Sequence, residues 1–488
     1  MWKPESLDPE NWDDMRKLVH QAVDDSLDYL ESIRDRAVWQ PAGEDVLQQL
    51  KTRAPLEPQG ARRAYDDFVS LIRPYQLGNS HPRFWGWYLG GGTVIGALGE
   101  FLAAMENSSV AGGNHIGVHV EKQVLDWCRQ MVGFPDEASG VLVSGASIGN
   151  IIALAVARHV MSEVDVRAHG VAGLARPVAF YTSVEAHSSV QRALELLGLG
   201  SCCLRKVRVT ERYAIDTDEL QQMIDRDRAA DVHPWGVIGT AGTTNTGAVD
   251  DLATLAAICR KEKMWFHVDG AIGAIVALSS AHRHVVRGME EADSLTMDLH
   301  KWMQVPFEAG CVFVKRRADH RDTFTTTPEY LERHERGISA GDFWLSDYGP
   351  QLSRGFRALK IWLSIKEQGT ARYARLVDRC MSLAQQFSIR LGETAELKLL
   401  APVVLNIVCF RYDPGGMSPD ALNELNRELV MRLQQSGVAV PSYTTLDGRF
   451  CMRVAFANHR TRAEDLDIFV DAALKLGEKL SRFGRTAE

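Results

Sequence analysis

Short apolar segments alternate with helical segments between residues 140 and 314, and this alternation constrains the fold more than any other feature of the chain. The apolar segments are almost continuously hydrophobic, which is typical of strands covered on both faces of a parallel sheet. We expect strands at Gly140–Ser144, Val178–Thr182, Val207–Val209, Gly236–Thr240, Trp265–Val268, Ser294–Met297 and Gly310–Val314. We expect helices between them at Asn150–His159, Ser189–Leu197, Thr217–Asp227 and Leu252–Lys261. The pattern predicts an α/β fold with a mostly parallel, seven-stranded sheet.

The segments on either side of this region have a different character. Residues 8–33 predict an amphipathic helix, but the chain up to about residue 75 has too little apolar material for its own core, so we expect it to pack on a partner subunit. The polar, irregular stretch 318–350 is typical of a functional loop, and strands and helices alternate again from residue 403 to residue 476. We therefore expect an N-terminal helical segment (1–84), a large domain (85–358) and a small C-terminal α+β domain (359–488).

Composition excludes several classes of protein. The 488 residues carry a net charge of −8 with scattered basic residues, which argues against a nucleic-acid surface and an anionic-membrane surface. The N-terminal stretch MWKPESLDPE lacks the apolar region of a signal peptide, and no apolar run is long enough to span a bilayer. The eight cysteines include no C-x-x-C pair and no zinc-ligand spacing. We expect a cytoplasmic protein with free thiols and no metal site.

Two charged residues stand at the ends of expected strands, where such sheets bind ligands. Asp269 closes the strand in WFHVDGAIGA, and Lys301 follows the strand in ADSLTMDLHKWMQVP. Taken alone, Asp269 fits the N-cap of a following helix, and Lys301 fits a solvated loop. The apolar and aromatic neighbours of Lys301 would instead desolvate its amine, which lowers the pKa of a lysine and favours a Schiff base.

Three further features accompany this pair. The small residues of the turn 144–147 lead into a helix, an arrangement that can hold a phosphate with backbone N–H groups. Thr244 follows another expected strand, and His187 stands at a helix start, where a structural histidine is also common. Pyridoxal 5′-phosphate (PLP) needs an amine, a carboxylate for its ring nitrogen, a phosphate site and a flat group against its ring. Together the five features match those needs.

From about His81 to the C-terminus the chain resembles the group II PLP-dependent decarboxylases, which include aromatic-L-amino-acid and tyrosine decarboxylases. The motifs that carry the resemblance are HPRFWGWYLGGGT (81–93), VSGASIGN (143–150), EAHSSV (185–190), GTTNTGAVDDL (242–252), HVDGAIGA (267–274), ADSLTMDLHKW (292–302), TPEYL (327–331) and SRGFRALKIW (353–362). The resemblance implies PLP-dependent transferase fold type I and decarboxylation of an L-amino acid. It also implies a homodimer with shared active sites.

The resemblance implies a role for each matching residue. Lys301 corresponds to the Schiff-base lysine, Asp269 to the partner of the pyridinium nitrogen, and His187 to the imidazole stacked on the ring. The other cofactor contacts correspond to Ala146 and Ser147 at the phosphate turn, Thr244, Ala271 on the second ring face, Ser294 and Asp298 near the phosphate, and His300 beside the lysine. We expect catalysis to use Lys301, His187, His300 and Tyr330.

Tyr330 bears on the choice of reaction. It corresponds to a loop tyrosine that closes over the partner subunit's site and is implicated in protonating the substrate carbon, although an ordinary half-buried tyrosine would also suit a loop. Related aldehyde synthases lack this tyrosine or the stacking histidine. Because the chain keeps Tyr330 and His187, we expect simple decarboxylation, with an aldehyde synthase or a carbon–carbon lyase as alternatives. The intact Lys301 and Asp269 argue against a non-catalytic scaffold.

The substrate is less closely defined. The aromatic segment Phe84, Trp85, Trp87 and Tyr88 suits an aromatic amino acid, or it packs a dimer interface. His115 and His119 leave an acidic substrate, aspartate or glutamate, as the alternative. The chain departs from the family at 112–121, where the family often has Trp and Ser-Pro, at Gly270 and Ile272 within the usual D-A-A-Y, and at Leu299, where Pro is common. None of these departures removes a catalytic group, and an aromatic amino acid is our expected substrate.

Overall fold

The large domain is built on a seven-stranded, mostly parallel sheet. The computed structural model describes residues 6–326 and 333–484. Within that part of the chain the strand order is β2 (Ser139–Val143), β8 (Gly310–Val314), β7 (Ser294–Asp298), β6 (Trp265–Asp269), β5 (His233–Thr240), β3 (Val178–Ser183) and β4 (Leu204–Val207). β8 runs antiparallel to both of its neighbours, and the other strands pair in parallel. The structure confirms the predicted fold class.

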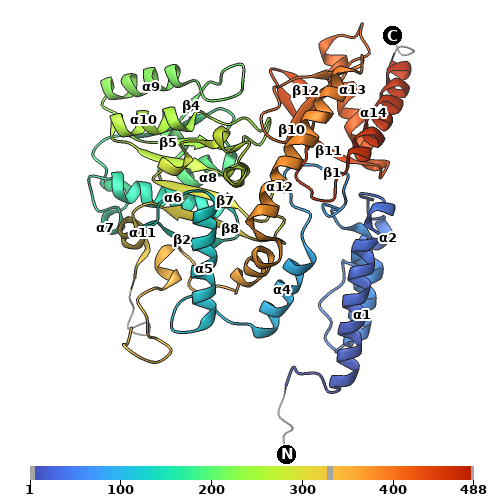
Figure 1. Cartoon of the computed structure of the whole chain (residues 1–488), viewed down its shortest axis with the longest axis horizontal. Helices are drawn as coiled ribbons and strands as arrows, with labels where there is room; N and C mark the ends of the chain where they lie inside the picture. Colours follow the sequence, from blue (N-terminus) through green and yellow to red (C-terminus); the bar gives the residue numbers. More distant parts are fainter. Residues whose placement is uncertain (1–5, 327–332, 485–488) are drawn as a thin grey trace, which may run out of the picture.

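Helices cover this sheet as expected for near-continuously apolar strands (Figure 1). The covering helices are α5 (Ile116–Met131), α6 (Ala146–Met161), α8 (Ser188–Leu196), α9 (Thr217–Ala229) and α10 (Leu252–Glu262). α6 packs on β6, β7 and β8, and small residues such as Gly149 permit this close approach, because a Cβ there would lie 2.6 Å from Thr296. The N-terminus of α6 is thereby brought to the carboxyl ends of the central strands.

A smaller domain carries a second, five-stranded sheet. Among the described residues its strand order is β1 (Phe84–Trp85), β11 (Val440–Leu446), β12 (Arg449–Ala455), β10 (Ile407–Tyr412) and β9 (Leu397–Leu399), next to α13 (Pro419–Gln435) and α14 (Ala463–Gly484). The ring of Trp85 packs edge-on against Phe456 and Phe469. The sheet of the small domain therefore includes one strand, β1, that spans the domain boundary expected after residue 84.

The long helix α12 (Ala358–Gly392) connects the two domains (Figure 1). It is kinked at Gly369, whose φ of 66° and ψ of 156° are non-helical. The first half packs on α4 (Val94–Glu106), and the second half reaches β9 and β10 of the small domain. Glycine tolerates this positive φ without the steric penalty that a Cβ would bring.

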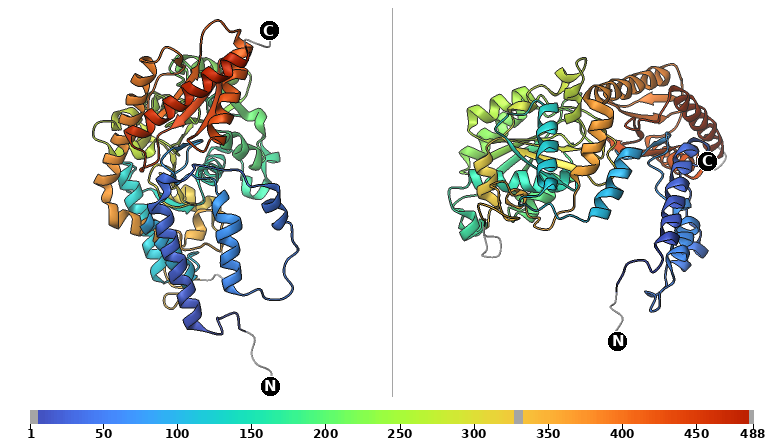
Figure 2. Two further views of the ribbon diagram at one scale, coloured as in Figure 1. Left: turned by 90° about the vertical axis from the view of Figure 1, so that its right-hand side faces the viewer. Right: turned by 60° about the horizontal axis from the view of Figure 1, so that its bottom comes forward.

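The N-terminal helices project from the body of the molecule (Figure 2). α1 (Trp12–Glu31), α2 (Glu44–Gln49) and α3 (Ala61–Asp67) lie below the small domain, and α1 has no buried residue. Arg34, just after α1, donates to both oxygens of the buried Asp465. Among its described residues, Ile33, Val38 and Val46 are buried, and Val38 packs with Phe84 and with Val440 of the small domain. No helix in the described ranges is long and apolar enough to cross a membrane.

Candidate active site

A small cavity lies where the carboxyl ends of β5, β6 and β7 meet the N-terminus of α6. Ligands bind at this end of strands in open α/β sheets. The cavity is lined by Ala146, Ser147, His187, Ser189, Thr240, Gly242, Thr244, Asp269, Ala271, Ile272, Asp298 and Lys301. Eight of these residues were predicted as site residues from the sequence: Ala146, Ser147, His187, Thr244, Asp269, Ala271, Asp298 and Lys301. The fold therefore brings together residues that are up to 155 positions apart, from Ala146 to Lys301.

Lys301 follows β7 in a tightly held turn. The backbone N–H groups of Leu299 and His300 both donate to the carbonyl of Ala309, at 2.9 and 3.0 Å. The side chain of Lys301 is 21% exposed, and its Nζ lies 3.1 Å from Oδ2 of Asp298. Gly90 closes over the turn, since its N–H donates to the His300 carbonyl and a Cβ there would lie 2.6 Å from the Lys301 carbonyl. The amine is thus directed into the cavity from a rigid support.

Asp269 ends β6 and is almost fully buried. Its Oδ1 accepts from the backbone N–H of Ala271 at 3.1 Å, and its Oδ2 accepts from Nδ2 of Asn150 at 3.0 Å. Gly270 follows without room for a side chain, because a Cβ would lie 2.8 Å from the Thr296 carbonyl. The carboxylate is therefore held in one orientation by two donors.

Asn150 is the centre of a buried hydrogen-bond network that the sequence did not reveal. Its Nδ2 donates to Asp269 and to Oγ of Ser189, both at 3.0 Å. Its Oδ1 accepts from Oγ1 of Thr296 at 3.0 Å and lies 3.0 Å from Nε2 of His267. All four hydrogen-bonding positions of the amide are occupied, which fixes its orientation.

The network also fixes the tautomer of His267. Because Oδ1 of Asn150 can only accept, the proton of His267 must be on Nε2. Nδ1 of His267 then accepts from Oγ of Ser294 at 2.9 Å, and Ser294 in turn accepts from the indole of Trp265 at 2.9 Å. Burial lowers the pKa of His267 to about 4, so the ring is neutral at pH 7.

His187 caps α8 at the edge of the cavity. Its Nδ1 lies 2.8 Å from Oγ of Ser189 and accepts from the Ser189 backbone N–H at 3.2 Å. The Ser189 hydroxyl accepts a hydrogen bond from the amide of Asn150 and donates its own proton to Nδ1 of His187. The proton of the His187 ring is therefore on Nε2. His187 is an exposed residue, but desolvation of its ring by the surrounding protein lowers its pKa, against the opposing effect of the Asp269 charge.

The turn before α6 contacts Asp298. Oδ1 of Asp298 accepts from the backbone N–H of Ala146 at 2.7 Å, while Oδ2 faces Lys301. Ser147 follows in the first turn of α6, where backbone N–H groups have no intrahelical acceptors. On the opposite wall, the carbonyl of Thr244 accepts from Nε of Arg453 at 2.6 Å.

Two predicted site residues among the described ones, Ser294 and His300, do not line the cavity. Ser294 lies at the start of β7, at the opposite end from Asp298, and its hydroxyl contacts His267 and Trp265. The Nδ1 of His300 accepts from the Ala309 N–H at 3.1 Å, its Nε2 lies 3.7 Å from Oδ2 of Asp298, and its ring packs on Phe307. Tyr330 lies outside the described residues.

The aromatic segment before α4 is mostly structural. Phe84, Trp85 and Tyr88 are buried, and the hydroxyl of Tyr88 hydrogen-bonds to Asn406. Trp87 is the exception, with 58% of its surface exposed. Arg453 donates to the carbonyls of both Trp87 and Thr244, so the backbone of Trp87 is linked to one wall of the cavity, and the Trp87 ring lies 6.2 Å from the ring of Phe84. Neither His115 nor His119 is among the lining residues.

Comparison with known proteins agrees with this geometry. Residues 43–413 match the model of the pyridoxal-dependent decarboxylase conserved domain. The chain is 33% identical over 475 residues to an aromatic-L-amino-acid decarboxylase of Bacillus atrophaeus, covering 96% of each chain, and 28% identical to a phenylacetaldehyde synthase of Arabidopsis thaliana, covering 92% and 93%. Its fold is similar to the crystal structure of Oryza sativa TDC with PLP and tryptamine, with a TM-score of 0.89, 24% identity and coverage of 97% and 100%.

Proposed function

Because the chain belongs to the pyridoxal-dependent decarboxylase family and is a PLP-dependent amino-acid decarboxylase, we propose that it converts an aromatic L-amino acid to the corresponding amine and CO₂. The observation that carries the choice of substrate class is the likeness to the Bacillus aromatic-L-amino-acid decarboxylase, which extends over 96% of both chains.

The residues around the cavity fit PLP. They supply one amine (Lys301), one doubly held carboxylate (Asp269), one imidazole (His187) and the N-terminal turn of α6. In addition, the buried hydroxyl of Thr240 has no hydrogen-bond partner among the described residues. This set matches the amine, ring-nitrogen and phosphate requirements of the cofactor.

We assign these residues as follows. Lys301 would hold the cofactor through its amine, Asp269 would hold a proton at the ring nitrogen, and Ser147 would bind the phosphate at the helix N-terminus. Asp298 anchors the turn through Ala146 and faces Lys301. Its carboxylate would not contact the phosphate directly, because two negative groups repel each other. When bound, PLP accepts into its ring the electron pair that remains when the substrate carboxylate leaves as CO₂.

The chain's own side chains orient the substrate. His187 is neutral, and its Nε2–H is free to donate to a substrate carboxylate, because Ser189 occupies its Nδ1. The network through Asn150 connects this imidazole to Asp269, so both groups are fixed relative to each other. Holding the substrate carboxylate in one orientation accelerates decarboxylation, because only a correctly aligned carboxylate leaves as CO₂.

Two features of the cavity support an aromatic substrate. The backbone of Trp87 is linked through Arg453 to the wall at Thr244, and we infer that its exposed indole offers the substrate a flat apolar surface. Apart from Lys301, the described lining residues include no lysine or arginine that could pair with the side-chain carboxylate of an acidic substrate. An aromatic ring would therefore be accommodated better than a second carboxylate.

A panel of L-amino acids tests the proposal. The purified, PLP-loaded protein should release CO₂ and amine from tryptophan, tyrosine or phenylalanine, and much less from glutamate or aspartate. Release of aldehyde with ammonia or hydrogen peroxide would instead identify an aldehyde synthase. Borohydride treatment should attach the cofactor to the peptide that contains Lys301, and attachment elsewhere would refute the assignment of that residue.

We also propose a cytoplasmic homodimer with shared sites. Exposed apolar residues lie along α4, namely Val94, Leu98, Phe101, Leu102 and Met105, which is a surface that monomers rarely leave open. All eight cysteines are free and seven are buried, as suits a reducing compartment. The part of Tyr330 in closing over the partner's site stays a prediction.

A further inference from the structure

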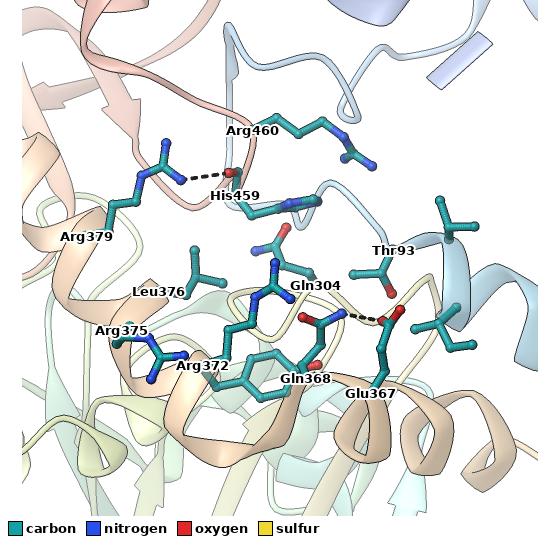
Figure 3. A pocket seen from close by; sticks show the side chains of 13 residues that line it. Thr93, Gln304, Glu367, Gln368, Arg372, Arg375, Leu376, Arg379, His459 and Arg460 are labelled. Atoms are coloured by element: carbon teal, nitrogen blue, oxygen red, sulfur yellow. Dashed lines mark hydrogen bonds between the residues drawn. The ribbon is translucent and has the colours of Figure 1, made fainter. Parts of the chain in front are cut away.

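A second cavity, of about 460 Å³, lies between the start of α4, the part of α12 on both sides of its kink and the loop 458–461 of the small domain (Figure 3). Its lining residues are Thr93, Val94, Ile95, Gln304, Glu367, Gln368, Arg372, Tyr373, Arg375, Leu376, Arg379, His459 and Arg460. It shares no residue with the cavity at Lys301. Its volume is within the range of small-molecule binding sites.

Positive charge dominates this cavity. Four arginines line it, Arg372, Arg375, Arg379 and Arg460, against a single acidic residue among the described lining, Glu367. Figure 3 shows Arg372 extending from α12 toward Gln304 and His459, into the middle of the cavity. Within the described part of the chain, Arg372 and Arg375 have no ion-pair or hydrogen-bond partner. Their guanidinium groups are therefore free to bind a ligand.

Two further arginines are held in place by neutral groups. Arg379 donates to the carbonyls of His459 and Thr461, and Arg460 donates to the carbonyl of Gly91 at 2.9 Å. Bonds to carbonyl oxygens fix a guanidinium without neutralising its charge. Both charges therefore remain available to attract an anion.

The helix α4 adds to the same potential. Its first residues Val94 and Ile95, with the N-cap Thr93, line the cavity, and the N-terminus of a helix carries partial positive charge. His459 adds no charge, because burial, reinforced by the nearby Arg460, lowers its pKa to about 4. Its neutral ring lies with Nε2 3.0 Å from the Gly92 carbonyl.

We propose that this cavity binds a small anion carrying at least two carboxylate or phosphate groups, with Arg372 and Arg375 as its principal contacts. Planar guanidinium groups match both kinds of oxyanion. The bound anion would join α12 just beyond its kink to the loop of the small domain that holds Arg460. Gln304 connects this cavity to the turn of Lys301, since its amide donates to the carbonyls of Lys301 and Ala457.

Calorimetry and thermal melting of the PLP-loaded protein test this site, with citrate as the carboxylate probe and pyrophosphate as the phosphate probe. At least one probe should bind saturably and raise the melting temperature above that in sodium chloride of equal ionic strength. The absorption of the bound cofactor should not change. The double variant R372A/R375A should bind the same probe about tenfold or more weakly, because hydrogen bonds to charged groups are lost.

A matched control is R283A/R287A, which removes two exposed arginines that do not line the cavity. It should bind the probe as the wild type does. Both pairs are exposed, so an unchanged melting temperature without anion verifies folding. Absence of saturable binding by both probes, equal weakening in the two double variants, or release of the cofactor by the probe would each overturn the proposal.

Discussion

At the scale of single residues, Asn150 has the widest influence on the candidate site. Its one amide contacts Asp269, Ser189, Thr296 and His267. It thereby orients the carboxylate expected at the ring nitrogen and, through Ser189, the imidazole of His187. The residue touches neither substrate nor cofactor in this assignment and acts by positioning others.

Replacing Asn150 with Ala should lower kcat/KM about tenfold or more and weaken cofactor binding, because the bond to the charged Asp269 is lost. The variant should also lose about 1–3 kcal/mol of unfolding free energy, since buried donors on His267 and Thr296 become unpaired. Steady-state kinetics, cofactor titration and urea unfolding measure these effects.

The matched control is Asn426→Ala. Asn426 is equally buried, but its amide bonds to the backbone of Tyr412 and Leu422 in the small domain. This variant should lose stability while keeping its cofactor affinity. If both variants lose affinity alike, or if N150A keeps wild-type affinity, the positioning role of Asn150 is wrong.

Trp87 offers a test of substrate class at the same scale. Trp87→Ala should reduce kcat/KM for an aromatic substrate about tenfold, because an apolar contact surface beside the cavity is removed. Ile389→Ala, which truncates an exposed apolar side chain on α12, should leave the value unchanged. Unaltered kinetics in W87A would place the substrate side chain elsewhere.

Sequence motifs predicted most of the residues that line the cavity, because each motif stands at a strand end or a helix start. Ser294 shows the limit of that reasoning. Ser294 shares a strand face with Asp298, but the two residues are four positions apart along the strand, a distance of about 13 Å.

Asn150 was missed because an asparagine in the first turns of a helix resembles an ordinary polar surface residue. Its partners come from two strands, β6 and β7, and from the helix α8, which only the fold brings together.

At the scale of elements, the kink of α12 determines how the two domains are joined. The backbone of Gly369 is in a region that L-residues with a side chain rarely adopt. The residues before the kink pack on α4, whereas those after it include the arginines of the second cavity. A straight helix would carry Arg372 and Arg379 away from the loop that holds Arg460.

Gly369→Ala should therefore lower the free energy of unfolding by about 1–3 kcal/mol, because the positive φ becomes strained. Gly392→Ala is the matched control at the end of the same helix, where φ is not positive and nothing lies within 4 Å of the added Cβ. Denaturant unfolding of both variants measures the difference. Equal stability of the two would show that α12 can straighten at no cost.

The sequence predicted the elements of the large domain well, since apolar strands and helical spacing are local signals. Two elements were harder. β4 begins at Leu204 rather than Val207, because Arg205 and Lys206 interrupt its apolar pattern at the edge of the sheet. β1 has only two residues, and its partner in β11 lies more than 350 positions away, so no local pattern could reveal the pairing.

At the scale of the whole molecule, buried histidines make stability depend on pH. Burial lowers the pKa of His81, His267 and His459 to about 4 and that of His320 to about 3, from 6.5. Below pH 6.5 the unfolded chain binds protons that the folded chain does not, so the free energy of unfolding should fall as the pH drops toward 4. The buried Asp250, with its pKa raised to about 6, and Asp293, whose pKa is also raised by burial, act in the opposite direction but are two groups against four.

Urea midpoints at pH 7.5, 6.0 and 5.0 measure this dependence and should decrease in that order. His320→Gln should make the decrease less steep, because one titrating group is removed, whereas the exposed His284→Gln should not. A midpoint that stays constant or rises on acidification would contradict the expectation.

Substitutions on the exposed surface of α4 test the proposed homodimer. Placing charge on its exposed apolar surface, as in Leu98→Glu with Phe101→Glu, should produce monomers without decarboxylase activity. Ile389→Glu, an equally exposed apolar position outside α4, should remain dimeric. Sedimentation velocity separates the two results, and a fully active monomer of the wild type would refute the assembly.

The turn of Lys301 depends on residues near the C-terminus, since Gln304 donates to the carbonyl of Ala457 and β1 is paired with β11. A ribosome must therefore have released the chain beyond Ala457 before this hydrogen bond to the turn can form. We expect a chain that terminates before Val440 to lack this support, to hold the vitamin-derived group poorly and to remain nearly colourless.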